Sequence, residues 1–240
     1  MSSRLHIAQP QSGYRYSVDA LILAHQVMPA AGNRIVDIGT GCGVIPLILA
    51  RNYPNIRITG VEIQEKLAAM AAANAAANGM AERIRIEHQD IRELKRSQAG
   101  AADIITCNPP HTARFAGRIN PHSQRAIARH EILMDLNDLL SAADRLLRES
   151  GRLTTIYPTR RMPEVLHKMH TAGFEPRKLR MIHFKPDAPA GRFFVEAVKH
   201  GQIGIHRPPP LYIEQADGSY TPEACAIFDF ANLAGTTPCL

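Results

Sequence analysis

Three glycines at alternate positions constrain the fold of this 240-residue chain more than any other feature. Gly39, Gly41 and Gly43 stand between the apolar run 34–38 and a second apolar run that begins at Val44. Because glycine has no Cβ, this loop can turn tightly out of a strand and pass close to a ligand. A ligand there meets the free N–H groups and the positive end of the following helix. The motif predicts a strand, a ligand-binding loop and a helix, with an ordinary glycine-rich turn as the alternative.

Strand-like and helix-like segments alternate along the rest of the chain. The last two strands are joined by a link short enough for a hairpin. This order predicts an α/β fold with a doubly wound, mostly parallel sheet and one antiparallel strand. The expected strands are 34–38, 56–61, 84–88, 103–107, 153–157, 178–184 and 193–199, and the main expected helices are 18–27, 64–78, 136–149 and 161–172.

Composition narrows the class of protein. A hydrophobic content of 45% is normal for a globular chain with a sizeable core. The formal net charge of +6 points to a polyanionic partner, although an ordinary basic protein has the same balance. The four cysteines form no CxxC pair, which argues against a zinc site or a disulfide framework and favours a reducing compartment. With no signal pattern and no membrane-spanning run, we expect a cytoplasmic protein without a metal.

Three acidic residues fall at or just after the ends of the first three strands. They are Asp37, Glu62 and Asp90. In open α/β sheets, ligands bind beyond the carboxyl ends of the strands, where the strand order reverses. Glu62 follows the glycines by roughly 20 residues, a separation that suits a carboxylate accepting hydrogen bonds from a ribose. The alternatives are a solvated helix cap for Glu62 and an N-cap of the next short helix for Asp90.

A proline-stiffened tetrapeptide, Asn108-Pro109-Pro110-His111, directly follows the apolar fourth strand. Prolines fix the backbone and donate no hydrogen bond, so Asn108 and the Pro109 carbonyl form a rigid pair of acceptors. Two acceptors on the hydrogens of an exocyclic amine, such as adenine N6, draw its nitrogen toward tetrahedral geometry and make it more nucleophilic. An aromatic residue beside them stacks on the target ring, as enzymes that act on flipped bases require. A stiffened turn without chemistry is the alternative.

The glycine loop departs from the GxGxxG fingerprint of dinucleotide dehydrogenases, because Val44 stands where the third glycine would be. The run 36–43 instead resembles the first motif of the class I S-adenosylmethionine-dependent methyltransferases. That resemblance implies a Rossmann-like sheet of seven strands with the antiparallel hairpin at one edge, and S-adenosylmethionine as the cofactor. The cofactor-binding residues that it implies are Asp37, Gly39, Thr40, Gly41, Gly43, Glu62, Ile63, Asp90, Ile91 and Asn108.

Asn-Pro-Pro-Tyr after the fourth strand is the signature of the amino-methylating members of this superfamily. These enzymes methylate adenine N6, cytosine N4 or a protein glutamine amide. His111 takes the place of the tyrosine in this chain. Imidazole can still stack, over a smaller face, and it can become charged near neutral pH. The resemblance therefore implies a catalytic set of Asn108, Pro109, Pro110 and His111, and the departure leaves the substrate open.

Segments at both ends of the chain narrow the resemblance further. Runs 13–20, 128–131, 209–212 and 220–223 look like motifs of the tRNA1(Val) adenine-37 N6-methyltransferase family, and the resemblance covers nearly the whole chain. By this resemblance, Tyr16 and Asp19 line the cofactor pocket. The expected parts are an N-terminal cofactor-covering segment, 1–32, a methyltransferase domain, 33–200, and an extension packed on the sheet edge, 201–240.

The segment after the Asn-Pro-Pro motif is basic. No acidic residue occurs between Asp103 and Glu131, whereas arginines and histidines accumulate there. Such a segment fits contacts with RNA phosphates, with a solvated loop and helix face as the alternative. The arginines expected to bind RNA are Arg114, Arg118, Arg125 and Arg129. A second basic group is interpreted as ordinary surface: Arg160, Arg161, Lys168, Arg177, Lys178 and Arg180.

These patterns predict direct transfer of a methyl group from S-adenosylmethionine to adenine N6 in a structured RNA, with the anticodon loop of a tRNA as the expected target. One alternative is a protein-glutamine or small-molecule amino methyltransferase. The other is a non-catalytic RNA-binding protein that retains the cofactor pocket. The sequence does not indicate the oligomeric state.

Overall fold

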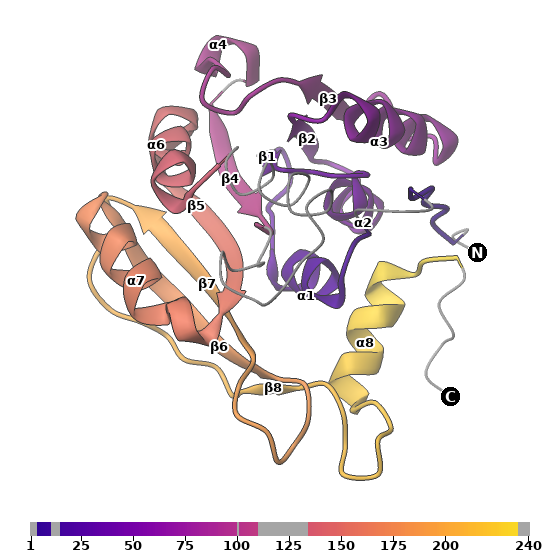
Figure 1. The fold of residues 1–240 in the computed structure, drawn as a ribbon. Coiled ribbons are helices and arrows are strands. Elements are labelled where there is room, and N and C mark those ends of the chain that lie inside the picture. Colours follow the sequence, from indigo (N-terminus) through magenta and orange to yellow (C-terminus); the bar gives the residue numbers. More distant parts are fainter. Residues whose placement is uncertain (1–3, 11–14, 100, 110–133, 235–240) are drawn as a thin grey trace, which may run out of the picture.

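The computed structural model describes residues 4–10, 15–99, 101–109 and 134–234. At its centre is one eight-stranded sheet with the order β3-β2-β1-β4-β5-β7-β6-β8 (Figure 1). β7 runs antiparallel to both of its neighbours, and the other described strand pairs are parallel. The strands are β1 (Arg34–Ile38), β2 (Arg57–Glu62), β3 (Ile84–His88), β4 (Ala102–Cys107), β5 (Leu147–Pro158), β6 (Phe174–His183), β7 (Arg192–Lys199) and β8 (Leu211–Tyr212).

The doubly wound α/β prediction is confirmed, and the expected count of seven strands is wrong by one. The additional strand is β8, whose Leu211 and Tyr212 pair with Ile182 and His183 of β6. A strand of two residues has no alternation that a sequence pattern could reveal. The β6–β7 hairpin therefore lies one strand in from the edge of the sheet.

Helices cover both faces of the sheet (Figure 1). They are α1 (Val18–Gln26), α2 (Val44–Asn52), α3 (Glu65–Ala77), α4 (Arg96–Ala99), α6 (Leu136–Leu146), α7 (Met162–Thr171) and α8 (Pro222–Ala231). Helices α1, α2 and α8 share one apolar core with the sheet, and α6 and α7 share the other. Helix α8 has no counterpart among the expected helices, and its buried Ala224, Ile227 and Ala231 make it part of the first core.

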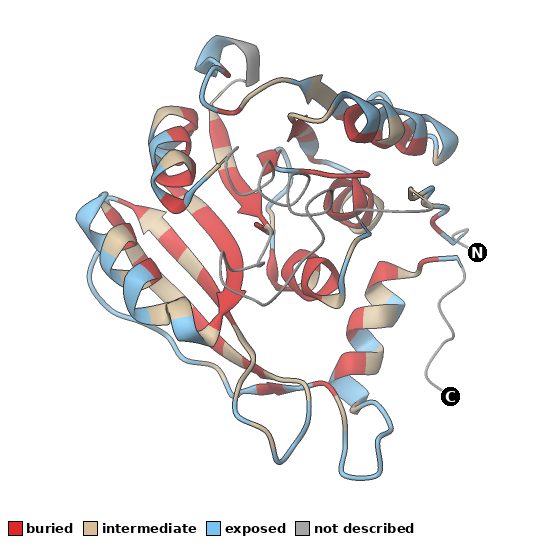
Figure 2. Cartoon of the chain, in the orientation of Figure 1, coloured by how far each residue is buried: buried red, intermediate tan, exposed pale blue. Residues whose placement is uncertain are grey.

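Strand β4 shows how the two cores divide the sheet. Ile104 belongs to the core under α1, α2 and α8, and Ile105 belongs to the core under α6 and α7. Successive side chains of a strand point to opposite faces, and both of these residues are fully buried. Figure 2 shows most of β4 coloured as buried. A continuous apolar run is the expected pattern for such a strand, which is why the sequence located β4 correctly.

The largest boundary difference concerns β5. The helix expected over 136–149 ends at Leu146, and β5 begins at Leu147 rather than at 153. Leu147 pairs with Ala102 of β4, and the register then shifts before Arg152 pairs with Ile104. Ser150, inside the irregular stretch, has a φ of 58°. Pairing with β4 thus sets the start of this strand, and local sequence does not show it.

Three further observations bear on the expectations from composition. Among the described helices, none is long and apolar enough to cross a membrane. In the same residues, no group of three His, Cys, Asp or Glu side chains is placed to hold a metal ion. Cys42 and Cys107 are buried free thiols, and Cys225 is disulfide-bonded.

Candidate active site at the carboxyl edge of the sheet

The strand order reverses between β1 and β4. The chain passes from β1 to β2 on one side, and β4 lies on the other. The pairing registers align Ile38 of β1 with Val61 of β2 and with Cys107 of β4. The glycine loop, Glu62 and Asn108 come at or after these positions, so they share one edge of the sheet. That edge is the place where open α/β sheets bind ligands.

The glycine loop adopts the backbone conformation for which glycine is needed. Gly39, Gly41 and Gly43 have φ angles of 69°, 58° and 85°. An L side chain in this left-handed region costs roughly 1–2 kcal/mol. At Gly43, a Cβ would also lie 3.3 Å from the Cβ of Ala71 in α3. The glycines therefore serve both the turn and the close packing of the alanine-rich helix.

A fourth glycine, Gly60 in β2, supports the same loop and was not identified from the sequence. A Cβ at Gly60 would lie 3.0 Å from Thr40 Oγ1 and 2.8 Å from Ile86 Cδ1. Because Gly60 has no Cβ, the glycine loop can lie directly against β2. The signal in the sequence is a glycine inside an apolar strand, which often marks a close backbone approach.

Asp37, at the end of β1, is a buried carboxyl with unused hydrogen-bonding capacity. Its Oδ1 accepts a hydrogen bond of 2.6 Å from the Thr106 hydroxyl. Its Oδ2 and the Thr40 hydroxyl are buried without a partner in the part of the chain that the structure describes. Burial raises the pKa of Asp37 to about 7, although the hydroxyls of Thr106 and of the nearby Thr40 oppose the shift. Buried polar atoms normally have partners, so these two atoms fit a bound polar ligand.

Glu62 holds the glycine loop in place through its carboxylate. Its Oε2 accepts a hydrogen bond of 2.9 Å from the Gly41 N–H, and its Oε1 accepts one of 3.0 Å from the Gln64 N–H. The residue is 5% exposed. A carboxylate has about four lone-pair positions, so these bonds leave acceptor capacity. The ribose-binding role stays a prediction.

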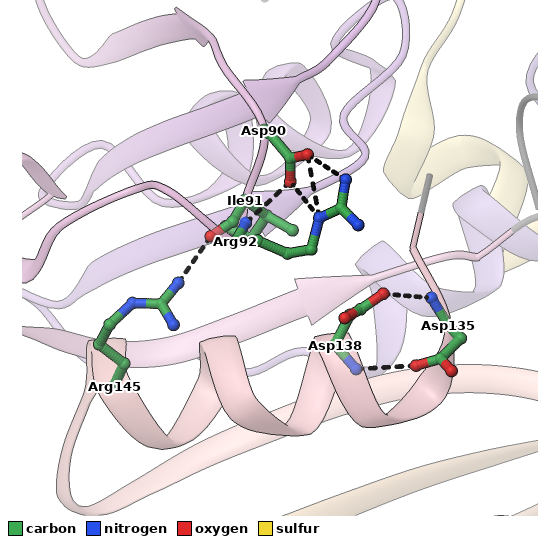
Figure 3. Close-up of polar contacts among 6 residues, drawn as sticks. All are labelled: Asp90, Ile91, Arg92, Asp135, Asp138 and Arg145. Carbon is green, nitrogen blue, oxygen red and sulfur yellow. Dashed lines mark hydrogen bonds and ion pairs between the residues drawn. The ribbon is translucent and has the colours of Figure 1, made fainter. Parts of the chain in front are cut away.

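Asp90 and its neighbour Arg92 form a self-contained turn beyond β3 (Figure 3). Asp90 Oδ1 accepts a hydrogen bond of 2.9 Å from the Arg92 N–H, and the Arg92 guanidinium reaches both carboxylate oxygens. The hydrogen bonds from the Arg92 side chain lower the pKa of Asp90. Asp90 therefore caps a turn and not the next short helix, which begins at Arg96, and its cofactor-binding role stays a prediction.

Helix α6 supports the loop that carries Ile91. Arg145 donates hydrogen bonds of 2.6 Å to the Ile91 carbonyl and 3.1 Å to the Leu94 carbonyl (Figure 3). The helix begins with a capping box in which the side chains of Asp135 and Asp138 each accept from the other's backbone N–H. Ile91 itself is 5% exposed. The loop after β3 is thus fixed from a helix more than forty residues further along the chain.

Asn74 in α3 connects the glycine loop to the N-terminal segment. Its Nδ2 donates hydrogen bonds of 2.9 Å to the Cys42 carbonyl and 3.0 Å to the Ala8 carbonyl. Its Oδ1 accepts one of 2.9 Å from the Ala8 N–H. The residue is 3% exposed. The sequence analysis missed this residue, and its only signal is a polar side chain among alanines on the buried side of the helix.

Tyr16 and Asp19 lie at the start of α1. Asp19 is buried and forms an ion pair of 2.9 Å with Arg192 of β7. Tyr16 is partly buried, and burial, with the nearby Cys42 thiol, raises its pKa. Cys42 belongs to the glycine loop, so Tyr16 stands near that loop. Their direct contact with the cofactor stays a prediction.

Asn108 ends β4 with an acceptor that no described group uses. Its Oδ1 is buried and has no hydrogen-bond partner among the described residues. Pro109, which follows, is buried. Pro110 and His111 of the predicted catalytic set lie outside the described residues, as do all four predicted RNA-binding residues, Arg114, Arg118, Arg125 and Arg129.

Ile63 contributes through its backbone. Its carbonyl lies 3.2 Å from His88 Nε2 at the end of β3. This contact joins the ends of β2 and β3 on the site edge. Nothing in the contact requires isoleucine, and a contact of its side chain with the cofactor stays a prediction.

Comparison with known proteins agrees with this arrangement. Residues 17–172 match the family model described as "Methyltransferase small domain", and this range contains the glycine loop, the strand-end acids and Asn108. The chain belongs to this methyltransferase family.

A curated relative in the same comparison is the tRNA1(Val) (adenine(37)-N6)-methyltransferase of Tolumonas auensis, with 31% identity over 94% of this chain and 93% of its own. Among solved structures, a predicted O-methyltransferase from Agrobacterium tumefaciens has 20% identity and a TM-score of 0.70, and the match covers 90% of this chain and 98% of the other. A geranyl diphosphate C-methyltransferase from Streptomyces coelicolor, solved with S-adenosyl-L-homocysteine, has 16% identity and a TM-score of 0.54 over 76% of this chain and 78% of its own. The two structures share the fold of this methyltransferase.

Proposed function

We propose that this protein is an S-adenosylmethionine-dependent methyltransferase that modifies adenine N6 in a tRNA. One observation carries the proposal: the buried Oδ1 of Asn108 has no partner in the described chain, and it stands beside the glycine loop at the end of β4. An amine hydrogen is the kind of group that this oxygen accepts. Curated relatives that span more than nine-tenths of this chain are named tRNA1(Val) adenine-N6-methyltransferases, which supports a tRNA adenine as the acceptor.

The half of the site around the glycine loop fits S-adenosylmethionine, which supplies an electrophilic methyl group when bound. The buried Asp37 Oδ2 and Thr40 hydroxyl need polar partners. Glu62 and Asp90 add two more carboxylates on the same edge. Asp90 is already paired with Arg92, so Glu62 and the ionised form of Asp37 are the carboxylates that suit a ligand with sulfonium and ammonium charges, because opposite charges attract strongly where water is partly excluded.

Asn108 and Pro109 orient the amine that accepts the methyl group. The Asn108 side chain and the Pro109 carbonyl accept hydrogen bonds from its two N–H groups, and the nitrogen lone pair is then free to face the methyl carbon. When the N–C bond forms, the S–C bond breaks, and the nitrogen releases one of its two protons to water. Pro109 has no N–H, so it offers the amine an acceptor and no competing donor. Placing the reacting atoms in line supplies much of the rate enhancement in such a transfer.

The acceptor half of the proposal also includes residues outside the described chain. His111 stacks on the target base, and Arg114, Arg118, Arg125 and Arg129 contact phosphates of the RNA. We place the enzyme in the cytoplasm, where its proposed substrate is found.

The test is mass spectrometry of nucleosides after incubation of the enzyme with S-adenosylmethionine and unmodified tRNA. We expect N6-methyladenosine with the wild-type enzyme. With Asn108→Ala we expect its loss, at unchanged binding of S-adenosylhomocysteine measured by calorimetry. The matched control is Asn137→Ala, an asparagine in the first turn of α6.

Other outcomes discriminate the alternatives. Methylation of a protein glutamine or of a small amine, without any modified tRNA, would support another amino methyltransferase. Cofactor binding without turnover on any RNA, or full activity of Asn108→Ala, would contradict the proposed mechanism.

A further inference from the structure

The two halves of the carboxyl edge of the sheet differ in the charged residues that they carry. On the β1–β2–β3 side it carries the acids Asp37, Glu62 and Asp90. On the other side of β4 lie the ends of β5 and β6 and the start of β7. β5 and β6 both run antiparallel to β7, so they point the same way as β4 and their carboxyl ends share its edge. Arg160 and Arg161 of this half were interpreted as ordinary surface from the sequence, and Lys185 was not considered there.

We infer that the second half binds the phosphate backbone of the RNA, through a surface that we name the cationic ledge, residues 158–161 and 184–192. The inference rests on the proposed function and specifies its partner surface. The ledge begins one strand away from Asn108, because β5 is the neighbour of β4. Neighbouring strands are roughly 4.8 Å apart, so a nucleotide whose base reaches Asn108 brings its phosphates over the ledge.

Hydrogen bonds between the two segments hold the ledge in shape. The Thr159 hydroxyl donates a hydrogen bond of 2.6 Å to the Ala190 carbonyl, and the Thr159 N–H donates one of 3.3 Å to the Gly191 carbonyl. The Gly191 N–H in turn donates one of 3.0 Å to the Ile182 carbonyl. Figure 1 shows the β6–β7 loop projecting beyond the sheet. A fixed backbone lowers the entropy cost of placing charges against phosphates.

Two cations of the ledge are available to a ligand. Arg160 and Lys185 are exposed, and neither side chain forms an ion pair or hydrogen bond with the described residues. Arg161, in contrast, is paired with Glu164 and lies over the Tyr157 ring.

Other charges lie on or beside the ledge. Arg192 is paired with the buried Asp19. Glu164 is shared between Arg161 and Lys168. Asp187 is an exposed acid on the β6–β7 loop, and Glu214 lies beside the ledge, where its N–H donates to the Phe184 carbonyl. These two acids equal Arg160 and Lys185 in number, so the inference rests on the exposed, unengaged side chains of the two cations rather than on a net positive charge.

The remaining residues of the second basic group are engaged elsewhere. Arg180 is buried against Glu223, Lys178 lies over the Phe194 ring, and Arg177 donates to the Gln202 carbonyl. Of that group, Arg160 alone among the described residues is both exposed and unengaged, and it is the one closest along the chain to the end of β5.

The test compares two double variants with the same change of net charge. Arg160→Gln/Lys185→Gln removes the two free cations of the ledge. Arg57→Gln/Arg96→Gln removes two exposed cations near the opposite edge, at the start of β2 and in α4 before β4. Each protein is titrated with a synthetic anticodon stem-loop RNA by fluorescence anisotropy between about 50 and 200 mM salt.

We expect the ledge variant to bind the stem-loop at least about three-fold more weakly at low salt, with the slope of log affinity against log salt reduced by about one for each lost contact. Its affinity for S-adenosylhomocysteine should not change, and the control variant should bind RNA as the wild type does. Equal RNA affinity and slope in the ledge variant and the wild type, with the wild type forming N6-methyladenosine, would overturn the ledge and leave the proposed function standing. Absence of RNA binding by the wild type would overturn both.

Discussion

The carboxyl groups of the three strand-end acids have different surroundings in the structure. Asp37 is buried, and desolvation raises its pKa to about 7. Asp90 is held by the guanidinium of its neighbour Arg92, whose hydrogen bonds lower its pKa. Glu62 accepts backbone N–H groups from the loop that it supports. Spacing in the sequence placed all three acids at strand ends, and only their surroundings in the structure distinguish them.

The raised pKa of Asp37 predicts a pH-dependent stability. The ordinary value is 3.8, and the folded protein holds the proton more tightly, up to about pH 7. The free energy of unfolding therefore contains a contribution that falls as pH rises from about 4 to about 7 and is flat above it. The free energy of unfolding of Asp37→Asn, which cannot ionise, should increase relative to that of the wild type across this window, by on the order of 4 kcal/mol. Urea unfolding of both proteins at several pH values measures the difference.

Asp103→Asn serves as a control in which the pH dependence of the stability difference should have the opposite sign. Burial alone would raise the pKa of Asp103, but hydrogen bonds from the Arg34 N–H and the Arg148 side chain outweigh it and lower the pKa. This variant should lose stability relative to the wild type as pH rises through the acidic range. A difference in unfolding free energy between Asp37→Asn and the wild type that does not change with pH would contradict a raised pKa at Asp37.

Gly60→Ala should weaken cofactor binding more than it weakens the fold. The added Cβ meets Ile86 Cδ1 at 2.8 Å and Thr40 Oγ1 at 3.0 Å. The Ile86 contact is with the end of a flexible side chain, so Gly60→Ala/Ile86→Val should recover the melting temperature. The Thr40 contact displaces the glycine loop, and we expect the affinity for S-adenosylhomocysteine to stay about ten-fold reduced, or 1.4 kcal/mol, in both variants. Recovery of that affinity in the double variant would show that Thr40 is not displaced.

At the scale of elements, the site is assembled by segments distant in sequence. Helix α6 holds the loop after β3 through Arg145, and α3 holds both the glycine loop and the N-terminal segment through Asn74. Each contact satisfies backbone carbonyls that no strand or helix pairs. Buried carbonyls of this kind are costly when left alone, so these side chains define the loops.

Arg145→Met should therefore loosen the loop that carries Asp90 and Ile91. Two hydrogen bonds from a charged donor are lost, and we expect a decrease of about 2 kcal/mol in the free energy of unfolding. Faster amide exchange confined to residues 89–95 should accompany it. Arg148→Met is the matched control, because Arg148 is exposed and its ion pair with Asp103 is at the surface, where such pairs contribute about 0–1 kcal/mol. Equal losses in the two variants would contradict a specific role for Arg145.

At the scale of the whole molecule, residues after β7 complete the sheet and one core. β8 extends the sheet beyond β6, and α8 packs against α1. Arg180 joins the two parts, since it donates to both carboxylate oxygens of Glu223 at 2.7 and 2.8 Å and to the Pro209 carbonyl at 2.8 Å. The motif-like runs 209–212 and 220–223 thus have a structural role, at the start of β8 and of α8.

A double-mutant cycle on Arg180 and Glu223 measures how firmly this extension is attached. Arg180→Gln should cost about 2 kcal/mol, because a buried guanidinium loses three hydrogen-bonding contacts. Glu223→Gln should cost less, since Glu223 is partly exposed. Urea unfolding of the double variant should give a coupling energy of about 1 kcal/mol. Strict additivity would show that the ion pair does not hold the extension.

The sequence by itself determined the local features of this protein. Glycines at 39, 41 and 43 are needed for positive φ angles whatever surrounds them, and the apolar run of β4 is needed for burial on both faces. The acids, Asn108 and Pro109 were also correctly placed at or just after strand ends, because the ends of elements follow from local patterns.

Only the tertiary structure decided which of these residues have partners. Asn74, Arg145 and Gly60 act on segments far away in the chain, and no local pattern encodes such contacts. The strand order, with β5 beside β4, likewise places Arg160 one strand away from Asn108. The physical reason is that the role of a hydrogen-bonding group or a cation depends on its neighbours in space, and the pairing of the strands sets those neighbours.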